Sequence, residues 1–490
     1  MFYTATIYGG LFFLVILVWH GFRSWYRLRH VPGPFLASIS VVWMLRKALS
    51  GRFHEYLRDV SEQYGPLVRI GPNELLSTDP NVLRMMSAVR SPYTKGDFYE
   101  TGRIIPEKHT VVSLRDDVAH RMLRAKMSIA FSGKGNKDFG FSAGIDHQIL
   151  ALVNLINSKY ISSTTDYHPV QFFQKISNFT LDVIGEISFG GAFGYLKEDC
   201  DLYNYHEISE SSLPIMNVLS VVPWLTKVAH KWPFNMMLPK EGDRVGFGRL
   251  MGVAKSWVDM RLQPGVKPRK DMMQAFIDNS MIRSELMQQV LVQIVSGSMS
   301  MTAAICMTLS CLITTPSAYR ALQREIDESL DVDEVNSPIT NAYSKRMPYL
   351  QAQVPKGGDV INGPVVPEGT QVGMNFFGLM RSKEIWGPDA DIFRPDRWLE
   401  ADYNTLKKMN SNMVDLDFGF GKYQCLGKPL AMMELNKIFI DLLRRYDFMA
   451  VNPQAPIRAR SAIFWSPSDF WLRITKRSPT SNPEDRQQDT

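Results

Sequence analysis

The chain has 490 residues, of which 45% are hydrophobic, and a formal net charge of +6. This length and apolar content allow one large core, and the small charge, without a basic run among aromatics, argues against nucleic-acid binding. Its cysteines are Cys200, Cys306, Cys311 and Cys425. They are too few and too scattered for a disulfide framework or a zinc cluster, so we expect a reducing, cytosol-facing domain.

The amino-terminal segment 1–22 is predicted to be a transmembrane anchor. Met1 to Trp19 carries no charge and, as a helix, spans about 28 Å, close to the hydrocarbon thickness of a bilayer. The basic residues after it are Arg23, Arg27 and Arg29. They predict that the rest of the chain is cytosolic. A cleaved signal peptide is the alternative, but it would need positive charge before the apolar run.

A basic hinge is expected over 23–36, where Pro32-Gly33-Pro34 ends the helix. A second stretch, Val221 to Leu238, is rich in apolar side chains and prolines. Two interpretations of this stretch stay open. It either dips into the same membrane or packs as an ordinary apolar loop on its own domain.

The segment 37–477 is expected to form one domain, mainly helical with small sheets. The expected short elements are a helix at 52–64, a hairpin over 68–80, an aromatic loop over 90–112, strands joined by Asn362-Gly363 and a hairpin over 461–477 around Pro467. Longer helices are expected at 144–160, 170–190, 245–263 and 283–313. The polar tail 478–490 is predicted to be disordered.

The most informative segment is FGFGKYQCLGKPLA, from Phe418 to Ala431, because it surrounds Cys425 with glycines and precedes an apolar helix. Glycines let a backbone turn tightly and approach a flat ring closely. The free N–H groups at a helix N-terminus favour an anionic sulfur, and a thiolate is the form that binds a metal. A buried cysteine in a plain turn is the alternative interpretation. The ten-residue spacing favours a thiolate presented to haem iron.

This motif resembles the cysteine-ligand loop of the cytochrome P-450 family, and is most similar to fungal pisatin demethylase-like members. The other similar segments are HRMLR (His120 to Arg124), DVIGEISFGGAFGYL (Asp182 to Leu196), VSGSMS (Val295 to Ser300) and FRPDRWLE (Phe393 to Glu400). The resemblance implies a P-450 fold behind the transmembrane helix, with haem b as the cofactor and Cys425 as its axial ligand.

The resemblance also implies the residues around the haem. In the cysteine loop these are Phe418, Gly421, Tyr423 and Gly427. Tyr423 stands where the family often has a cation, with Lys422 next to it. On the helix before the core, Arg124 and His120 are expected to bind the haem carboxylates. A surface position is the alternative for Arg124.

On the distal side the resemblance places Gly297, Ser300 and Thr302 beside the bound oxygen. We expect Gly297 to leave room for dioxygen and Ser300 to relay protons; a bond from Ser300 to a carbonyl of its own helix is the alternative. Thr302 lies about 200° round the helix from Ser300 and is expected to face elsewhere. Met299 replaces the acid that is usual in the family and carries no proton.

One family element is not found in the sequence. The E-x-x-R of helix K, which pairs with the arginine at Arg397, has no match between Met347 and Gly369, where a stretch is missing. A buried guanidinium without a partner is costly, so we expect Arg397 to move toward solvent or to pair with Asp391 or Asp396.

Two functions from different classes stay open at this stage. The first is a monooxygenase of the endoplasmic reticulum membrane, single-pass with a cytosolic catalytic domain. It would use O2 and NADPH electrons from NADPH-cytochrome P-450 reductase to hydroxylate or demethylate a hydrophobic fungal secondary metabolite. The second is a haem-binding or degenerate relative without turnover, which Met299 and the missing E-x-x-R would explain.

Overall fold

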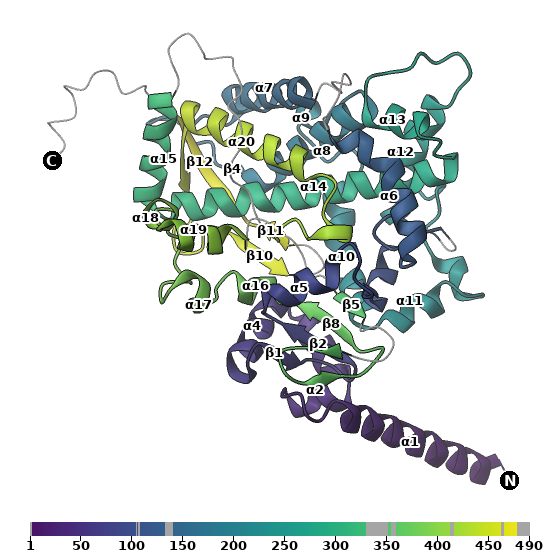
Figure 1. Cartoon of the computed structure of the whole chain (residues 1–490). Helices are drawn as coiled ribbons and strands as arrows, with labels where there is room; N and C mark the ends of the chain where they lie inside the picture. The colour runs from purple at the N-terminus through teal and green to yellow at the C-terminus, as the bar shows by residue number, and fades with distance from the viewer. Residues whose placement is uncertain are drawn as a thin grey trace.

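The computed structural model describes residues 2–103, 105, 108–132, 141–329, 351–353, 359–411, 416–461 and 465–477. A mainly helical body with small sheets is confirmed, and the helix α1 (Phe2–Arg27) projects from it (Figure 1). This helix extends beyond the expected boundary at residue 22. The tail 478–490 lies outside the described residues.

The expected long helices are all present, with ends that differ from the prediction by at most three residues. The helices of the amino-terminal half are α2 (Phe35–Ile39), α3 (Val42–Leu49), α4 (Phe53–Tyr64), α5 (Pro80–Ser87), the 3-10 helix η1 (Asp97–Gly102), α6 (Asp117–Ser132), α7 (Phe141–Lys159), α8 (Phe172–Phe189), α9 (Tyr195–Glu198) and α10 (Tyr205–Val221). The later helices are α11 (Pro223–Ala229), η2 (Phe234–Met237), α12 (Gly246–Arg261), α13 (Met272–Asp278), α14 (Arg283–Ile313), α15 (Pro316–Ser329), α16 (Phe376–Leu379), α17 (Lys383–Trp386), α18 (Arg397–Glu400), α19 (Tyr403–Met409), η4 (Gly421–Tyr423) and α20 (Lys428–Arg445).

The strands form small, separate sheets. The largest has the order β1-β2-β8-β5-β3 and consists of β1 (Leu67–Arg69), β2 (Glu74–Ser77), β3 (Thr94–Lys95), β5 (Gln351–Gln353) and β8 (Gln371–Met374). The others pair β6 (Asp359–Val360) with β7 (Val365–Val366), β10 (Arg458–Ser461) with β11 (Trp465–Ser468), and β12 (Trp471–Lys476) with both β4 (Val170–Gln171) and β9 (Tyr446–Ala450). The hairpins over 68–80 and at Asn362-Gly363 are confirmed.

The expected hairpin around Pro467 is wrong. Pro467 lies inside β11, opposite Ala459 of β10, and β12 pairs with β9 instead of with β11. A proline is tolerated at that place because β11 belongs to a two-stranded ribbon, where an N–H is not needed on the outer side. The strand β10 was missed because Arg458–Ser461 lacks the apolar alternation of a buried strand.

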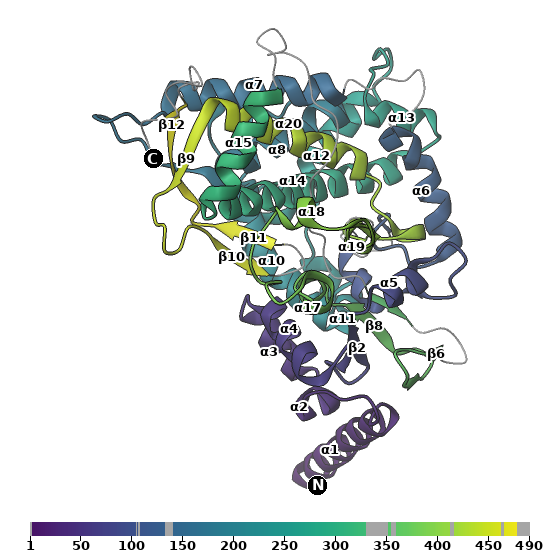
Figure 2. The same ribbon diagram turned by 60° about the vertical axis from the view of Figure 1, so that its left-hand side comes forward.

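The long helix α14 crosses the body below α20 in Figures 1 and 2 and forms the centre of the main hydrophobic core with α7 and α8. Among the described residues, α14 is the helix that is long and apolar enough to cross a bilayer, and α10 with α11 qualifies only as one bent span. Half of the apolar stretch of α14 is buried in the body, as expected of a core helix. A transmembrane role for α1 therefore stays a prediction.

Candidate active site

The loop that carries Cys425 is fixed by its backbone. The Cys425 N–H donates to the Phe418 carbonyl oxygen at 2.6 Å, and Phe418 itself is buried. Gly421 has φ +55°, and a Cβ added to it would lie 2.2 Å from the carbonyl oxygen of Ser87 in α5. A glycine is therefore required there, because the loop rests directly on the backbone of α5.

The sulfur of Cys425 lies at the N-terminus of α20, half-buried and beside cationic groups. Burial raises the pKa of the thiol, while the backbone N–H groups of Gly427 and Lys428 and the charge of Arg124 oppose that rise. A Cβ on Gly427 would lie 3.7 Å from the sulfur, so this glycine leaves one side of the sulfur open. These donors and the neighbouring cation suit a thiolate ligand of a metal.

The cationic side of the site is built on α6. Arg124 is half-buried, and its pKa is lowered by burial and raised by the nearby Cys425. Among the described residues it pairs with no carboxylate. His120 is buried, and this burial, with the charges of Lys95 and Arg124, lowers its pKa to about 3. Among the described residues of α6, Arg124 is therefore a half-buried cation with hydrogen-bonding capacity left for a haem carboxylate.

Lys422 and Tyr423, three and two residues before Cys425, bond to Asp117 at the start of α6. The Tyr423 hydroxyl donates to Asp117 at 2.7 Å, and Lys422 Nζ donates to the other oxygen of Asp117 at 2.6 Å. Lys422 also donates to the carbonyl oxygens of Ser91 and Tyr93 at 2.9 and 2.7 Å. The structure thus gives Lys422 and Tyr423 a role in holding the cysteine loop to the start of α6.

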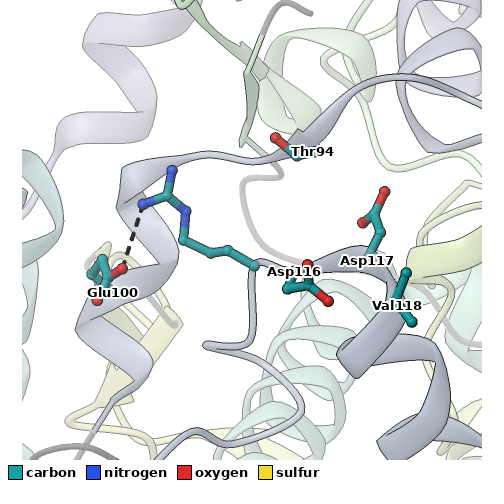
Figure 3. A pocket seen from close by; sticks show the side chains of 6 residues that line it. Thr94, Glu100, Asp116, Asp117 and Val118 are labelled. Atoms are coloured by element: carbon teal, nitrogen blue, oxygen red, sulfur yellow. Dashed lines mark hydrogen bonds and ion pairs between the residues drawn. The ribbon is translucent and has the colours of Figure 1, made fainter.

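Asp117, which anchors the cysteine loop, also lines a polar pocket. This pocket has a volume of about 460 Å³ and lies between β3, η1 and the start of α6 (Figure 3). Its lining residues are Thr94, Glu100, Arg115, Asp116, Asp117 and Val118. Such a polar lining does not suit an apolar substrate. The pocket shares Asp117 with the hydrogen bonds that hold the cysteine loop to α6.

A buried lysine that the sequence analysis missed completes this region. Lys95 is 4% exposed, and its Nζ donates to the carbonyl oxygens of Val111 and Val112, both at 2.8 Å. It also lies 5.5 Å from the centre of the Tyr423 ring. Burial lowers the pKa of Lys95 to about 7. Its position in the aromatic loop expected over 90–112 gave no signal of burial, because lysines are ordinarily solvated.

On the distal side, α14 presents one half-exposed face. That face carries Val292, Val295, Ser296, Met299 and Ser300. The Ser300 hydroxyl donates to the Ser296 carbonyl oxygen at 2.6 Å, which is the back-bonded alternative left open by the sequence. Ser296 and Ser300 nevertheless place the two hydroxyls of this face one turn apart.

The other two expected distal residues face α8. A Cβ on Gly297 would lie 2.9 Å from Cδ1 of Ile184, so this glycine makes room for helix packing and not for dioxygen. Thr302 is buried, and its hydroxyl lies 2.9 Å from that of Thr180. The expectation that Thr302 faces away from Ser300 agrees with this contact, which argues against a catalytic role.

Arg397 finds partners without an E-x-x-R glutamate. Its guanidinium donates to the carbonyl oxygens of Trp386, Asp389, Ile392 and Arg394 and lies 3.4 Å from a carboxylate oxygen of Asp389. The expectation that Arg397 moves toward solvent or pairs with Asp391 or Asp396 is therefore wrong. The turn before α18 supplies enough acceptors for its guanidinium. Residues 330–350 and 354–358, where the missing stretch would join, lie outside the described residues.

Fold and site together fit a helical protein in which a cysteine thiolate would bind the iron of a haem. The cysteine loop with its open sulfur, the N–H groups of Gly427 and Lys428 and the uncommitted Arg124 all fit that cofactor. A family model described as Cytochrome P450 matches residues 31–470. The chain belongs to the cytochrome P450 family, whose members are haem enzymes with a cysteine as the axial iron ligand.

Three similar fungal proteins are named as monooxygenases. Cytochrome P450 monooxygenase ABA1 of Pyricularia oryzae is 34% identical, over 92% of this chain and 93% of its own length. Cytochrome P450 monooxygenase aba1 of Botryotinia fuckeliana is also 34% identical, with the same coverage. Cytochrome P450 monooxygenase cicH of Emericella nidulans is 28% identical over 96% of this chain and 98% of its own length. Nothing in the described residues favours a relative without turnover.

Proposed function

We propose that this chain is a membrane-anchored monooxygenase that hydroxylates or O-demethylates an apolar fungal secondary metabolite. The observation that carries the proposal is the half-buried sulfur of Cys425, which meets the N–H groups of Gly427 and Lys428 and the charge of Arg124. A haem held at that sulfur would supply the activation of O2, with NADPH electrons from a cytochrome P-450 reductase, so that one oxygen atom enters the substrate and the other becomes water.

The residues of this chain then have separate tasks. Cys425 would hold the iron of the haem, and Arg124, with the buried His120 one turn before it on α6, would bind the haem carboxylates. Phe418 and the glycines Gly421 and Gly427 shape the loop, and Tyr423 fixes it to α6. The apolar face of α14 excludes water, and the Ser300 hydroxyl holds a proton on that face when it turns from its bond to Ser296. The role of Ser300 follows from its position alone.

The membrane anchor and the location in the endoplasmic reticulum belong to the same proposal. The described apolar side chains of α1, from Ile7 to Phe22, are exposed in the structure, as suits a helix in lipid. The second apolar stretch also exposes its large side chains, at Trp224, Trp232, Phe234, Met236 and Met237. This exposure favours the membrane-dipping interpretation of 221–238 over a loop packed on its own domain.

The decisive test removes the sulfur. In the reduced, haem-loaded protein, carbon monoxide is expected to give the difference band of thiolate-ligated haem, and Cys425→Ala is expected to abolish it. Cys200→Ala is the matched control, because Cys200 is exposed and lies outside the site. A protein that binds no haem, or a thiolate band that survives Cys425→Ala, would refute the proposed function.

A further inference from the structure

The β6–β7 hairpin has an outer face that is apolar although it is exposed. Val360 and Val365 are 58% and 64% exposed, and the register of the two strands places them directly opposite each other. The inner face carries Ile361 and Val366, which are buried. An antiparallel hairpin with one solvated face ordinarily has polar side chains on that face. The valine pair therefore makes this outer face unlike one that is built for water alone.

The hairpin is held against the base of α1. His30, three residues after that helix, donates through Nε2 to the Val365 carbonyl oxygen at 2.6 Å. The inner face of the hairpin belongs to the same buried cluster as Leu28 and Val31, which also follow α1. Figure 2 shows β6 at the end of the body from which α1 projects. The two valines are therefore exposed beside the point where α1 joins the body.

The short helix α2 adds a second exposed apolar pair at the same place. Phe35 and Leu36 are both exposed. The helix α2 packs on the last turns of α1, since a Cβ added to Gly21 would lie 3.7 Å from the Ile39 carbonyl oxygen. Two exposed apolar pairs from distant parts of the sequence thus lie next to the base of one helix.

We propose that the exposed apolar pairs of α2 and of the β6–β7 hairpin form one collar that rests on a lipid surface around α1. This inference rests on the proposed function, which anchors α1 in a membrane. A lipid surface is assigned because α1 itself exposes its described apolar side chains from Ile7 to Phe22. Arg23 and Arg29 are exposed near the same base and suit lipid phosphate groups. The helix supplies the anchoring, and the collar fixes which face of the body meets the lipid.

The test places a fluorophore on the collar of the full, haem-loaded chain in vesicles of phosphatidylcholine and phosphatidylserine. An environment-sensitive probe is attached at Val365→Cys or at Leu36→Cys, with Cys200 and Cys311 replaced by alanine because neither is buried. Both probes are expected to shift to the blue and to be quenched by phosphatidylcholine that is spin-labelled near its headgroup. Met449→Cys is the matched control, because Met449 is 61% exposed in β9, at the opposite end of the body (Figure 2). Its probe is expected to stay unquenched.

Val360→Glu, added to the Val365→Cys protein, is expected to lower the ratio of lipid-bound to free hairpin about tenfold, because a charge replaces one buried valine. An unquenched probe at Val365 in vesicle-bound protein that keeps its thiolate-haem band would overturn the inference and leave the proposed function standing. Equal quenching at Met449, or a blue shift that follows protein concentration without lipid, would overturn it as well, the latter by assigning the collar to a second copy of the chain. Protein that does not bind the vesicles would refute the collar and the proposed membrane anchor together.

Discussion

Apart from Cys425, Arg124 is the residue on which we expect haem retention to depend most. Burial of its guanidinium lowers the pKa of Arg124, and the nearby Cys425 raises it. The neighbouring lysines are already committed, Lys95 to two carbonyl oxygens and Lys422 to Asp117. The charge of Arg124 is therefore available to an anionic ligand, which the two carboxylates of haem provide.

Arg124→Gln is expected to weaken haem binding by tenfold or more, because a hydrogen bond to a charged group contributes about 1.5–3 kcal/mol. Arg121→Gln is the matched control, since Arg121 is exposed on the same helix. The measurement is the loss of the Soret band when a competing apo-globin removes haem from each variant. Equal losses from the two variants would show that Arg124 acts only through the general positive charge of α6.

At the residue scale, the sequence identifies site residues that follow a fixed spacing, but not those whose role depends on contacts in the fold. The ten-residue cysteine motif and the pair His120 and Arg124 on α6 are of the first kind. Gly297 could not be assigned from the sequence, because only the structure shows Ile184 against it. The buried Lys95 was also missed, because it is held by a loop backbone that the sequence cannot place.

At the scale of elements, the cysteine loop packs on the backbone of α5 and leads directly into α20. Gly421 combines a positive φ of +55° with contact to the Ser87 backbone. Gly419 also has a positive φ, of +73°, and lies 3.1 Å, measured from an added Cβ, from the Tyr423 carbonyl oxygen. The loop therefore tolerates neither side chain, and its shape determines where the sulfur points.

Gly421→Ala is expected to destabilise the protein by about 2–4 kcal/mol and to lower its haem content, because the new Cβ meets backbone that cannot turn aside. Gly363→Ala is the matched control: Gly363 has φ +99° in the β6–β7 hairpin, but no atom lies near its added Cβ. This control is expected to cost only about 1 kcal/mol. Urea-unfolding midpoints and haem per protein check both values. Equal midpoints would mean that φ alone matters at Gly421.

The elements themselves were predictable to different degrees. The bounds of α14 were predicted to the residue, because its apolar periodicity continues over many turns. The short strands were harder, since strands of two to four residues are defined by distant partners. Gln351–Gln353 illustrates this difficulty, because its three residues form a strand only through their pairing with β3 and β8.

At the scale of the whole molecule, the base of α1 is attached firmly to the body. Arg69 is 1% exposed and donates to the carbonyl oxygens of Ser24, Trp25, Ser38, Gly71 and Pro72. Gly33 is packed so closely on β1 that an added Cβ would lie 2.2 Å from the Arg69 carbonyl oxygen. The last turns of α1 thus belong to the catalytic body, and the orientation of the body at a membrane follows from that of the helix.

Two truncations separate these two parts of α1. Deletion of residues 2–22 is expected to move the protein from the membrane fraction to the supernatant and to preserve the thiolate-haem spectrum, because the acceptors for Arg69 remain. Deletion of residues 2–29 removes the carbonyl groups of Ser24 and Trp25, which leaves a buried guanidinium short of acceptors at a cost of about 1–3 kcal/mol for each group. The longer deletion is therefore expected to have a lower melting temperature than the shorter one. Equal melting temperatures would show that the Arg69 contacts do not stabilise the body, and a shorter deletion that stays with the membrane would assign the anchor to the exposed stretch at 221–238.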